Sequence, residues 1–339
     1  DRLKSGSERF FKSWESLLFV VFVAIFIGNS FASPYFLDPW NLSDATFNFT
    51  EKALVALAMA LVIISGEIDL SVASIIAIAS TMMGTALQYG AGPFELVLVG
   101  LATGVVCGAI NGAMVGYVRM RAFLTTLVTL VIFRSVFDLV FPKFSTAIVT
   151  NTPDSAELDF LGAGDLFGFP VSFVITAVIA IALHVVLSRT RYGWRLLAVG
   201  GARRSAYNAG INVRWTIFSA YVFGSVLCSL SGFLFAARIG SAASDVGAGL
   251  ELQALTATVL GGISLGGGRG TVAKAVMGAV FVLLLSNSLL TLAVSGPGAD
   301  LVLGLILILA VFLDVRWTKN RHKLLRSVYI SPTYAKLPA

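Results

Sequence analysis

Runs of apolar residues, each close to twenty residues long, recur along most of this sequence. A helix of about 20 apolar residues is what crosses the roughly 30 Å hydrocarbon core of a bilayer. Of the 339 residues, 57% are hydrophobic and 12% are charged, whereas roughly 25% of the residues in a soluble domain are charged. A water-soluble fold of this size could not bury so much apolar surface. The bilayer is therefore the expected solvent for most of the chain.

The hydropathy pattern predicts an all-α polytopic membrane protein with about ten transmembrane helices. Two of these spans are weakly marked, because Glu51 and Lys52 interrupt one and the other is short. The first span could mimic a signal peptide, but more spans follow it, so we expect a retained helix. The expected spans cover residues 15–33, 47–65, 70–88, 93–118, 122–142, 170–188, 215–237, 251–264, 271–293 and 297–314.

The positions of Lys and Arg predict the orientation, because basic residues stay on the cytoplasmic side. Alternation from a cytoplasmic N-terminus places the Arg-rich connections inside and the acidic loop 143–169 outside. Ten spans bring both termini to the cytoplasm, whereas an odd number would misplace one. The net charge of +6 is then an orientation signal and not a nucleic-acid surface. The expected parts are a cytoplasmic segment 1–14, a transmembrane domain 15–314 and a basic cytoplasmic tail 315–339.

Motifs of catalysis are missing from the sequence. It has no phosphate-binding loop, no HExxH, no paired cysteine motif and only two histidines, so no metal site and no enzyme activity are expected. Cys107 and Cys228 lie inside apolar runs and are interpreted as packing residues. If transport consumes ATP, its hydrolysis belongs to another polypeptide.

Glycines recur one helical turn apart in the fourth span, at positions 100, 104, 108 and 112. Such a ridge lets two helix backbones approach closely. Asn111 lies beside the ridge and could either face a pathway or form a hydrogen bond with a neighbouring helix.

Two breaks between spans look alike, Gly66 to Leu70 and Gly261 to Leu265. Both follow a span expected to run inward and precede one that returns outward. Interrupted helices can line a solute path, because their freed backbone groups need partners. Glu67 and Asp69 could belong to such a path or could cap the next helix.

Arg134 and Asp138 lie one turn apart inside the fifth span. A lone charge in hydrocarbon costs at least about 2.5 kcal/mol, so an ion pair facing the protein interior is the economical arrangement. The pair is either structural or part of the solute path.

The long connection from Ser188 to Arg214 is basic and has glycines at its breaks, as a short surface helix held by turns would have. It could be a loop on anionic lipid or a docking helix for a cytoplasmic partner. Lipid attraction explains the arginines, but it gives no reason for the small, Gly-bounded surface from Ala198 to Ala209.

This connection resembles the cytoplasmic segment of permeases in the ribose, xylose, arabinose and galactoside family of ATP-binding-cassette importers. Further motifs match that family in order: Gly-Glu-Ile-Asp-Leu-Ser-Val at 66–72, Gly-Ala-Ile-Asn-Gly at 108–112, Phe-Leu-Thr-Thr-Leu at 123–127, and the Gly-rich run 260–270. The resemblance covers residues 45–315. Ala202, where the family usually has Asn, and Lys274, where a small residue is common, are departures that bear on docking and not on membership.

The resemblance implies an importer permease fold in a bacterial plasma membrane. The implied partners are an ATPase subunit that binds ATP and Mg, an extracytoplasmic solute-binding protein and a second permease copy. It implies that segment 189–214 couples to the ATPase through Gly193, Arg195, Ala198, Gly200, Gly201, Ala202, Arg203, Ala206, Ala209 and Gly210. The candidates for a translocation pathway or helix break are Glu67, Asp69, Asn111, Thr125, Thr126, Gly261, Gly262 and Ser264.

The expected function is therefore import of a small neutral polyhydroxylated solute, a monosaccharide or a sugar alcohol, driven by a separate ATPase. Related permeases import amino acids or nucleosides, so import of such a solute by this chain is an alternative. The alternative from another class is a secondary transporter or channel driven by an ion gradient, which commonly keeps a charged site near mid-membrane. The sequence does not identify the solute.

Overall fold

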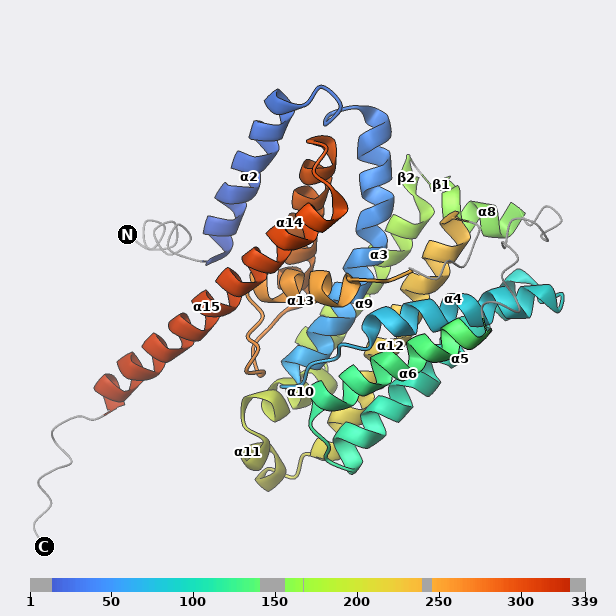
Figure 1. Cartoon of the computed structure of the whole chain (residues 1–339). Helices are drawn as coiled ribbons and strands as arrows, with labels where there is room; N and C mark the ends of the chain where they lie inside the picture. The colour runs from blue at the N-terminus through green and yellow to red at the C-terminus, as the bar shows by residue number, and fades with distance from the viewer. Residues whose placement is uncertain (1–13, 141–155, 167, 240–245, 330–339) are drawn as a thin grey trace, which may run out of the picture.

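The computed structural model describes residues 14–140, 156–166, 168–239 and 246–329, and most of them form helices (Figure 1). A two-residue hairpin pairs β1 (Asp165–Leu166) with β2 (Phe169–Pro170), with Asp165 opposite Pro170. The helices are α2 (Trp14–Ala32), α3 (Pro39–Ile64), α4 (Val72–Gln88), α5 (Pro93–Gly112), the π-helix η1 (Ala113–Tyr117), α6 (Ala122–Val140), α8 (Ala156–Ala163), α9 (Val171–Arg189), α10 (Arg191–Gly201), α11 (Arg203–Asn208), α12 (Val213–Ile239), α13 (Leu250–Leu260), α14 (Val272–Thr291) and α15 (Gly296–Tyr329).

Helices α3 and α12 form the centre of the bundle. α3 begins at Pro39, where the side chain of Asp38 accepts a 2.8 Å hydrogen bond from the amide of Trp40. From Ala53 to Ile64 every residue of α3 is buried. One side of α3 contacts α13 and α14, and α12 contacts α3, α4 and α5. The core is therefore built around α3 and α12. The connection after α3 and the connection before α12 belong to the candidate site.

The glycine ridge of α5 packs against α12, as the sequence predicted. A Cβ atom on Gly108 would lie 2.7 Å from the Cα of Val222, and one on Gly104 would lie 2.8 Å from the carbonyl oxygen of Ser225. Gly112 and Gly116 meet α12 in the same way further along. The missing side chains bring the two backbones into direct contact.

Five helices of the described chain are long and apolar enough to cross a membrane: α3, α5 with η1, α9, α12 and α14. Shorter apolar helices of 10–17 residues lie within α2, α4, α6, α13 and α15. Each predicted span coincides with a helix, so the expectation of a mainly helical protein with apolar helices is confirmed. Ten crossings and cytoplasmic termini stay predictions.

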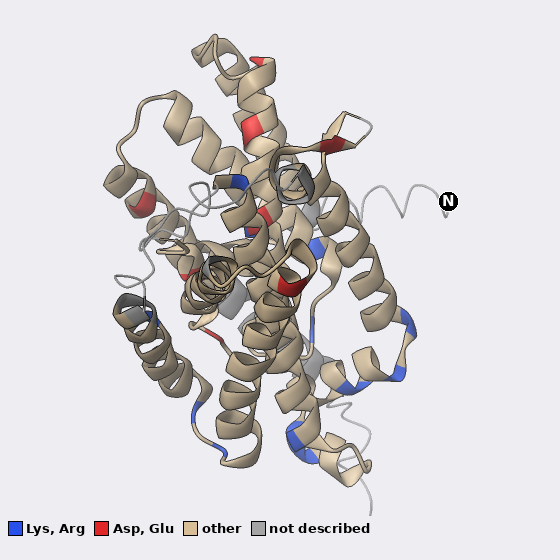
Figure 2. Ribbon diagram, turned by 90° about the vertical axis from the view of Figure 1, so that its right-hand side faces the viewer, with Lys and Arg blue, Asp and Glu red and all other residues tan. Residues whose placement is uncertain are grey.

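Charged residues are unevenly distributed along the bundle. Figure 2 shows most of the blue Lys and Arg at its lower end, where α10 and α11 lie, and most of the red Asp and Glu above it. Cys107 and Cys228 are both buried and free, as packing residues would be. Part of the acidic loop 143–169 falls outside the described residues.

Candidate coupling and translocation site

The connection after α9 folds into two short helices. Ala202, at φ −160° and ψ 89°, separates α10 from α11. Leu196 and Val199 are fully buried and anchor α10 to the bundle, whereas Trp194 and Tyr207 are 67% and 72% exposed. The segment therefore has one face fixed to the membrane helices and one face open.

Gly200 and Gly201 lie side by side at the end of α10 but have different surroundings. A Cβ atom on Gly200 would overlap the carbonyl oxygen of Ile64 and would lie 2.5 Å from the amide nitrogen of Gly268. A Cβ on Gly201 would meet only the Cα of Gly268, at an ordinary 3.8 Å. Gly200 therefore belongs to an internal contact, and Gly201 faces outward.

The two breaks that look alike in the sequence adopt the same helix ending. Gly66 has φ +84° and Gly262 has φ +91°, and each follows the last turn of its helix. The amide of the following residue donates a hydrogen bond to the carbonyl oxygen five residues earlier in the chain. These bonds run from Glu67 to Val62 at 3.2 Å and from Ile263 to Thr258 at 3.1 Å. This is the Schellman ending, which needs a left-handed residue and so favours glycine. The likeness in sequence thus has a structural basis.

The end of α3 and the loop that follows the second break also touch each other. The amide of Gly268 donates a 2.9 Å hydrogen bond to the carbonyl of Ile64, and a Cβ on Gly267 would lie 2.6 Å from the Cα of Gly66. Because Gly200 packs against both, three segments meet through backbone atoms. We call this meeting point the glycine junction; it comprises Ile64, Gly66, Gly200, Gly267 and Gly268.

An ion pair strengthens the junction from the side of α11. Arg203 Nη2 lies 2.5 Å from Glu67 Oε1 and 3.2 Å from the carbonyl oxygen of Gly66. Burial raises the pKa of Glu67 above its usual value, and the guanidinium of Arg203 acts in the opposite direction. The arginine thus connects α11 to the connection between α3 and α4.

A buried polar network follows the first break. Asp69 accepts hydrogen bonds from the amide of Ser71 at 2.9 Å and from its hydroxyl at 2.5 Å, and Asn111 Nδ2 lies 2.8 Å from that hydroxyl oxygen. The hydroxyls of Tyr221 and Thr126 both donate to the carbonyl of Ile68, at 3.1 and 3.4 Å. Asp69 therefore holds Ser71, the residue before α4, although no side chain caps that helix, and Asn111 bonds to a neighbouring segment.

Two buried atoms near this network have no hydrogen-bond partner among the described residues. They are Oδ1 of Asn111 and Oγ1 of Thr125, and both residues are fully buried. Buried polar atoms are normally paired, so these are positions where water or a solute hydroxyl could bind. The sequence candidates Glu67 and Asp69, in the connection before α4, thus lie near Asn111 on α5 and near Thr125 and Thr126 on α6.

The remaining candidates of the second break lie apart from this network. A Cβ on Gly261 would overlap the carbonyl oxygen of Lys274, so Gly261 packs α13 against α14. Gly262 closes the turn, and the carbonyl of Ser264 accepts from the amide of Gly267 at 3.0 Å. These three residues shape the loop that reaches the glycine junction.

The other predicted coupling residues divide between the two faces of the segment. Gly193 is buried where a Cβ would overlap the carbonyl oxygen of Leu187, and Ala206 is buried as well. Ala198 is half-buried, and the exposed members are Arg195, Gly201, Ala202, Arg203, Ala209 and Gly210.

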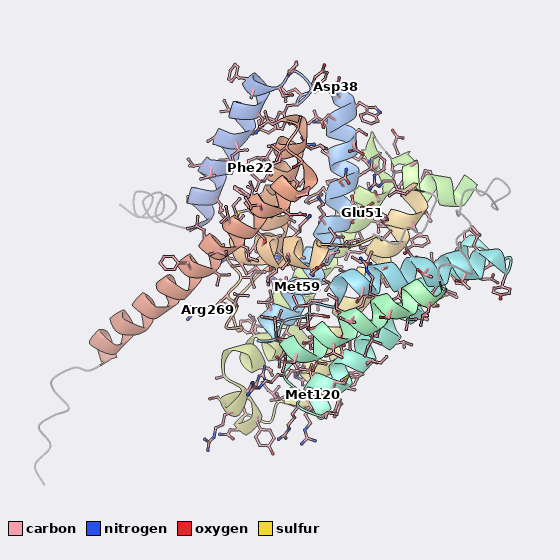
Figure 3. The ribbon with its side chains drawn as sticks, viewed as in Figure 1. Phe22, Asp38, Glu51, Met59, Met120 and Arg269 are labelled. Carbon is pink, nitrogen blue, oxygen red and sulfur yellow. The ribbon has the colours of Figure 1, made fainter. Side chains whose placement is uncertain are left out.

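Sequence reasoning missed a buried ion pair between α3 and α12. Arg238 Nε lies 2.8 Å from Glu51 Oε1, and Figure 3 shows Glu51 on α3 beside α12. Glu51 was noted only as an interruption of its span, because its partner lies 187 residues away. Arg134 Nη1 donates to the carbonyl of Val246 at 2.8 Å. The side chain of Asp138 is outside the described part, so the pair with Arg134 stays a prediction.

Comparison with known proteins shows the family to which the chain belongs. Residues 41–311 match the family model described as the branched-chain amino acid transport system permease component. The chain belongs to this permease family. The ribose import permease protein RbsC of Escherichia coli (strain K12) is 32% identical over 313 residues, which cover 91% of this chain and 97% of that protein. Membership in the importer permeases, predicted from the motifs, is confirmed.

Other permeases of the family show similar likeness. The D-allose transport system permease protein AlsC of Escherichia coli (strain K12) is 29% identical over 87% of this chain and 90% of its own length. The fructose import permease protein FrcC of Rhizobium meliloti is 32% identical over 79% of this chain and 75% of its own length. No solved structure matches the chain.

Proposed function

We propose that this chain is the transmembrane subunit of an ATP-driven importer that carries a small neutral polyhydroxylated solute across a bacterial plasma membrane. A separate ATPase binds and hydrolyses ATP, a solute-binding protein delivers the solute from outside, and two permease copies surround the pathway. The observation that carries the proposal is the glycine junction, because it connects the exposed segment of α10 and α11 to two helix breaks inside the bundle.

The geometry supports a mechanical link. Gly200 contacts Ile64 at the end of α3 and Gly268 in the loop between α13 and α14 through backbone atoms. Backbone contacts cannot relax by a change of rotamer, so a displacement of α10 moves both connections. An ATPase that holds the open face of α10 and α11 would thereby drive the helices that follow each break.

The solute class is inferred from the relatives and from the polar network. The related permeases are named for ribose, D-allose and fructose, which are neutral polyhydroxylated molecules. The unpartnered oxygens of Asn111 and Thr125 accept the kind of hydrogen bond that a sugar hydroxyl donates. Hydroxyl-rich solutes need such partners in a dry protein interior.

The direct test is uptake by cells that co-express the chain with a candidate ATPase and a candidate solute-binding protein. Radiolabelled D-ribose, D-allose and D-fructose are supplied in turn. We expect accumulation of at least one sugar, and loss of accumulation when the ATPase is replaced by a variant that binds ATP without hydrolysing it. Unchanged accumulation with that variant contradicts the proposal.

An ion-driven transporter is the second candidate function. It is favoured by the charged residues that lie within α3 and α12, Glu51 and Arg238, which sequence reasoning had not counted as deep charges. Vesicles that contain the chain alone separate the two functions. Uptake that survives without the ATPase but stops when an ionophore removes the proton or sodium gradient establishes the second function.

A further inference from the structure

A wide hollow lies at the basic end of the bundle, beside α11. Its volume is about 1370 Å³. Its walls come from the turn between η1 and α6, from α11, from the first turn of α12 and from the connection after α3. Figure 3 places Met120, which lines it, at this lower end of the molecule.

Five arginines line the hollow, against the single carboxylate of Glu67. That carboxylate is already paired with Arg203 at 2.5 Å. The side chains of the other four arginines form no ion pair or hydrogen bond with the residues that the structure describes. Like charges gathered around one hollow repel each other unless an anion lies between them, and the guanidinium fork matches the oxygens of a phosphate. The four are Arg119, Arg121, Arg204 and Arg214.

The backbone of the turn that carries two of these arginines is constrained. Arg119 has φ +64°, a left-handed conformation that residues with a side chain adopt rarely. The preceding helix η1 is a π-helix, and the amide of Met120 closes the turn on the carbonyl of Met114 at 3.0 Å. Strained turns and π-helices are frequent at binding sites.

Exposed apolar side chains lie at the hollow or next to it in the chain, and we call them its apolar rim: Phe123 lines the hollow, and Tyr117, Val118 and Trp215 adjoin lining residues. Val118 and Phe123 are 68% and 53% exposed, and Trp215 is 53% exposed while stacked on Phe218 at 5.4 Å between ring centroids. Tyr117, also half-exposed, contacts the same Phe218 ring edge-on. Aromatic residues next to arginines are typical of the level of the lipid headgroups. A soluble phosphate has no apolar part that could contact these side chains, whereas lipid acyl chains would cover them.

We propose that this hollow binds the phosphate headgroup of an anionic phospholipid of the cytoplasmic leaflet, with its acyl chains along the apolar rim. The bound lipid bridges α11 and the turn before α6. The proposal requires that this end of the chain faces the cytoplasm, but it does not require that the chain is an importer. Its failure and the failure of the proposed function are therefore separable.

The test uses the full chain, purified in neutral detergent and freed of lipid, with dioleoyl phosphatidylglycerol added in mixed micelles. Native mass spectrometry counts the retained lipids, and the change in tryptophan fluorescence gives the dissociation constant. We expect the double variant Arg121→Gln/Arg214→Gln to bind phosphatidylglycerol about tenfold more weakly or worse. The matched control, Arg189→Gln/Arg191→Gln, removes the same charge from exposed positions outside the hollow and should bind like the unaltered chain.

Three outcomes overturn the proposal. If the control variant loses as much phosphatidylglycerol binding as the hollow variant, the lipid is attracted to the basic surface in general and not to the hollow. Equal binding of inorganic phosphate, or of phosphatidylcholine, means that an anionic lipid is not the ligand. Unchanged lipid binding in the hollow variant, with loss of co-purification of the ATPase, assigns the hollow to a protein partner. Arg121→Lys/Arg214→Lys keeps the charge, so if the Gln variant fails to fold, intermediate binding by the Lys variant supports the site and undiminished binding contradicts it.

Discussion

The amide of Gly268 donates a hydrogen bond to the carbonyl of Ile64, two residues that are 204 positions apart, and Gly200 packs against both. Three connections thereby share one point of backbone contact. Neither Gly200 nor Gly268 can take a side chain there without moving a neighbour. This contact is what allows an exposed segment to act on the interior of the bundle.

Replacement of Gly200 by Ala should disrupt the glycine junction. The new Cβ would overlap the carbonyl oxygen of Ile64 and lie 2.5 Å from the amide of Gly268, and overpacking of this kind costs about 1–3 kcal/mol. We expect a lower apparent melting temperature in detergent and reduced sugar uptake. Gly201→Ala is the matched control, since its Cβ meets Gly268 at 3.8 Å. Equal melting temperatures for the two variants would contradict the tight contact.

Replacement of Gly201 by Trp should separate the chain from its ATPase. Gly201 is exposed beside the open face of α10 and α11, so the bulky ring obstructs the partner. We expect normal membrane insertion and an unchanged melting temperature, but loss of co-purification of the ATPase from cells that express both subunits. Gly201→Ala should co-purify normally. Intact complexes with the Trp variant would count against docking at this segment.

Replacement of Gly108 by Val should force α5 away from α12. A Cβ at this position would lie 2.7 Å from the Cα of Val222, and neither backbone can yield locally. We expect a loss of stability of about 1–3 kcal/mol or more, measured as a lower apparent melting temperature. Ala102→Val adds bulk to an exposed position on the same helix and should change little. A comparable decrease in that control would mean that α5 is sensitive to bulk on any face.

Features that depend on short stretches of sequence could be predicted. The ridge that contains Gly104 and Gly108 follows from helical periodicity, and the two breaks at Gly66 and Gly262 follow from the need for a left-handed residue at a helix end. Each pattern can be recognised from a short stretch of neighbouring residues. The sequence alone therefore predicts these helix contacts and helix ends.

Contacts between distant segments could not be predicted. Nothing local to Ile64 indicates that Gly268 and Gly200 meet it, and nothing local to Glu51 indicates Arg238. Glu51 weakened the prediction of its own span because charge counts against a membrane helix, yet α3 extends through it from Pro39 to Ile64. The pairing neutralises the charge in the interior, and only the fold supplies the partner.

The ion pair between Glu51 and Arg238 gives the last prediction. Glu51 is 6% exposed, so Arg238→Leu leaves a buried carboxylate without its ion-pair partner, and Glu51→Leu leaves the guanidinium with only its longer 3.8 Å ion pair to Asp44. Each single variant should lose about 3–5 kcal/mol, whereas replacement of both by Leu should restore much of the stability, because a buried pair and an apolar pair of similar volume are often equivalent. The apparent melting temperatures of the unaltered chain, the two single variants and the double variant together form a double-mutant cycle. Asp44→Asn is the control, because the side chain of Asp44 is 42% exposed and lies 3.8 Å from Arg238, so it should have little effect. Additive losses in the double variant would show that the two charges do not stabilise each other.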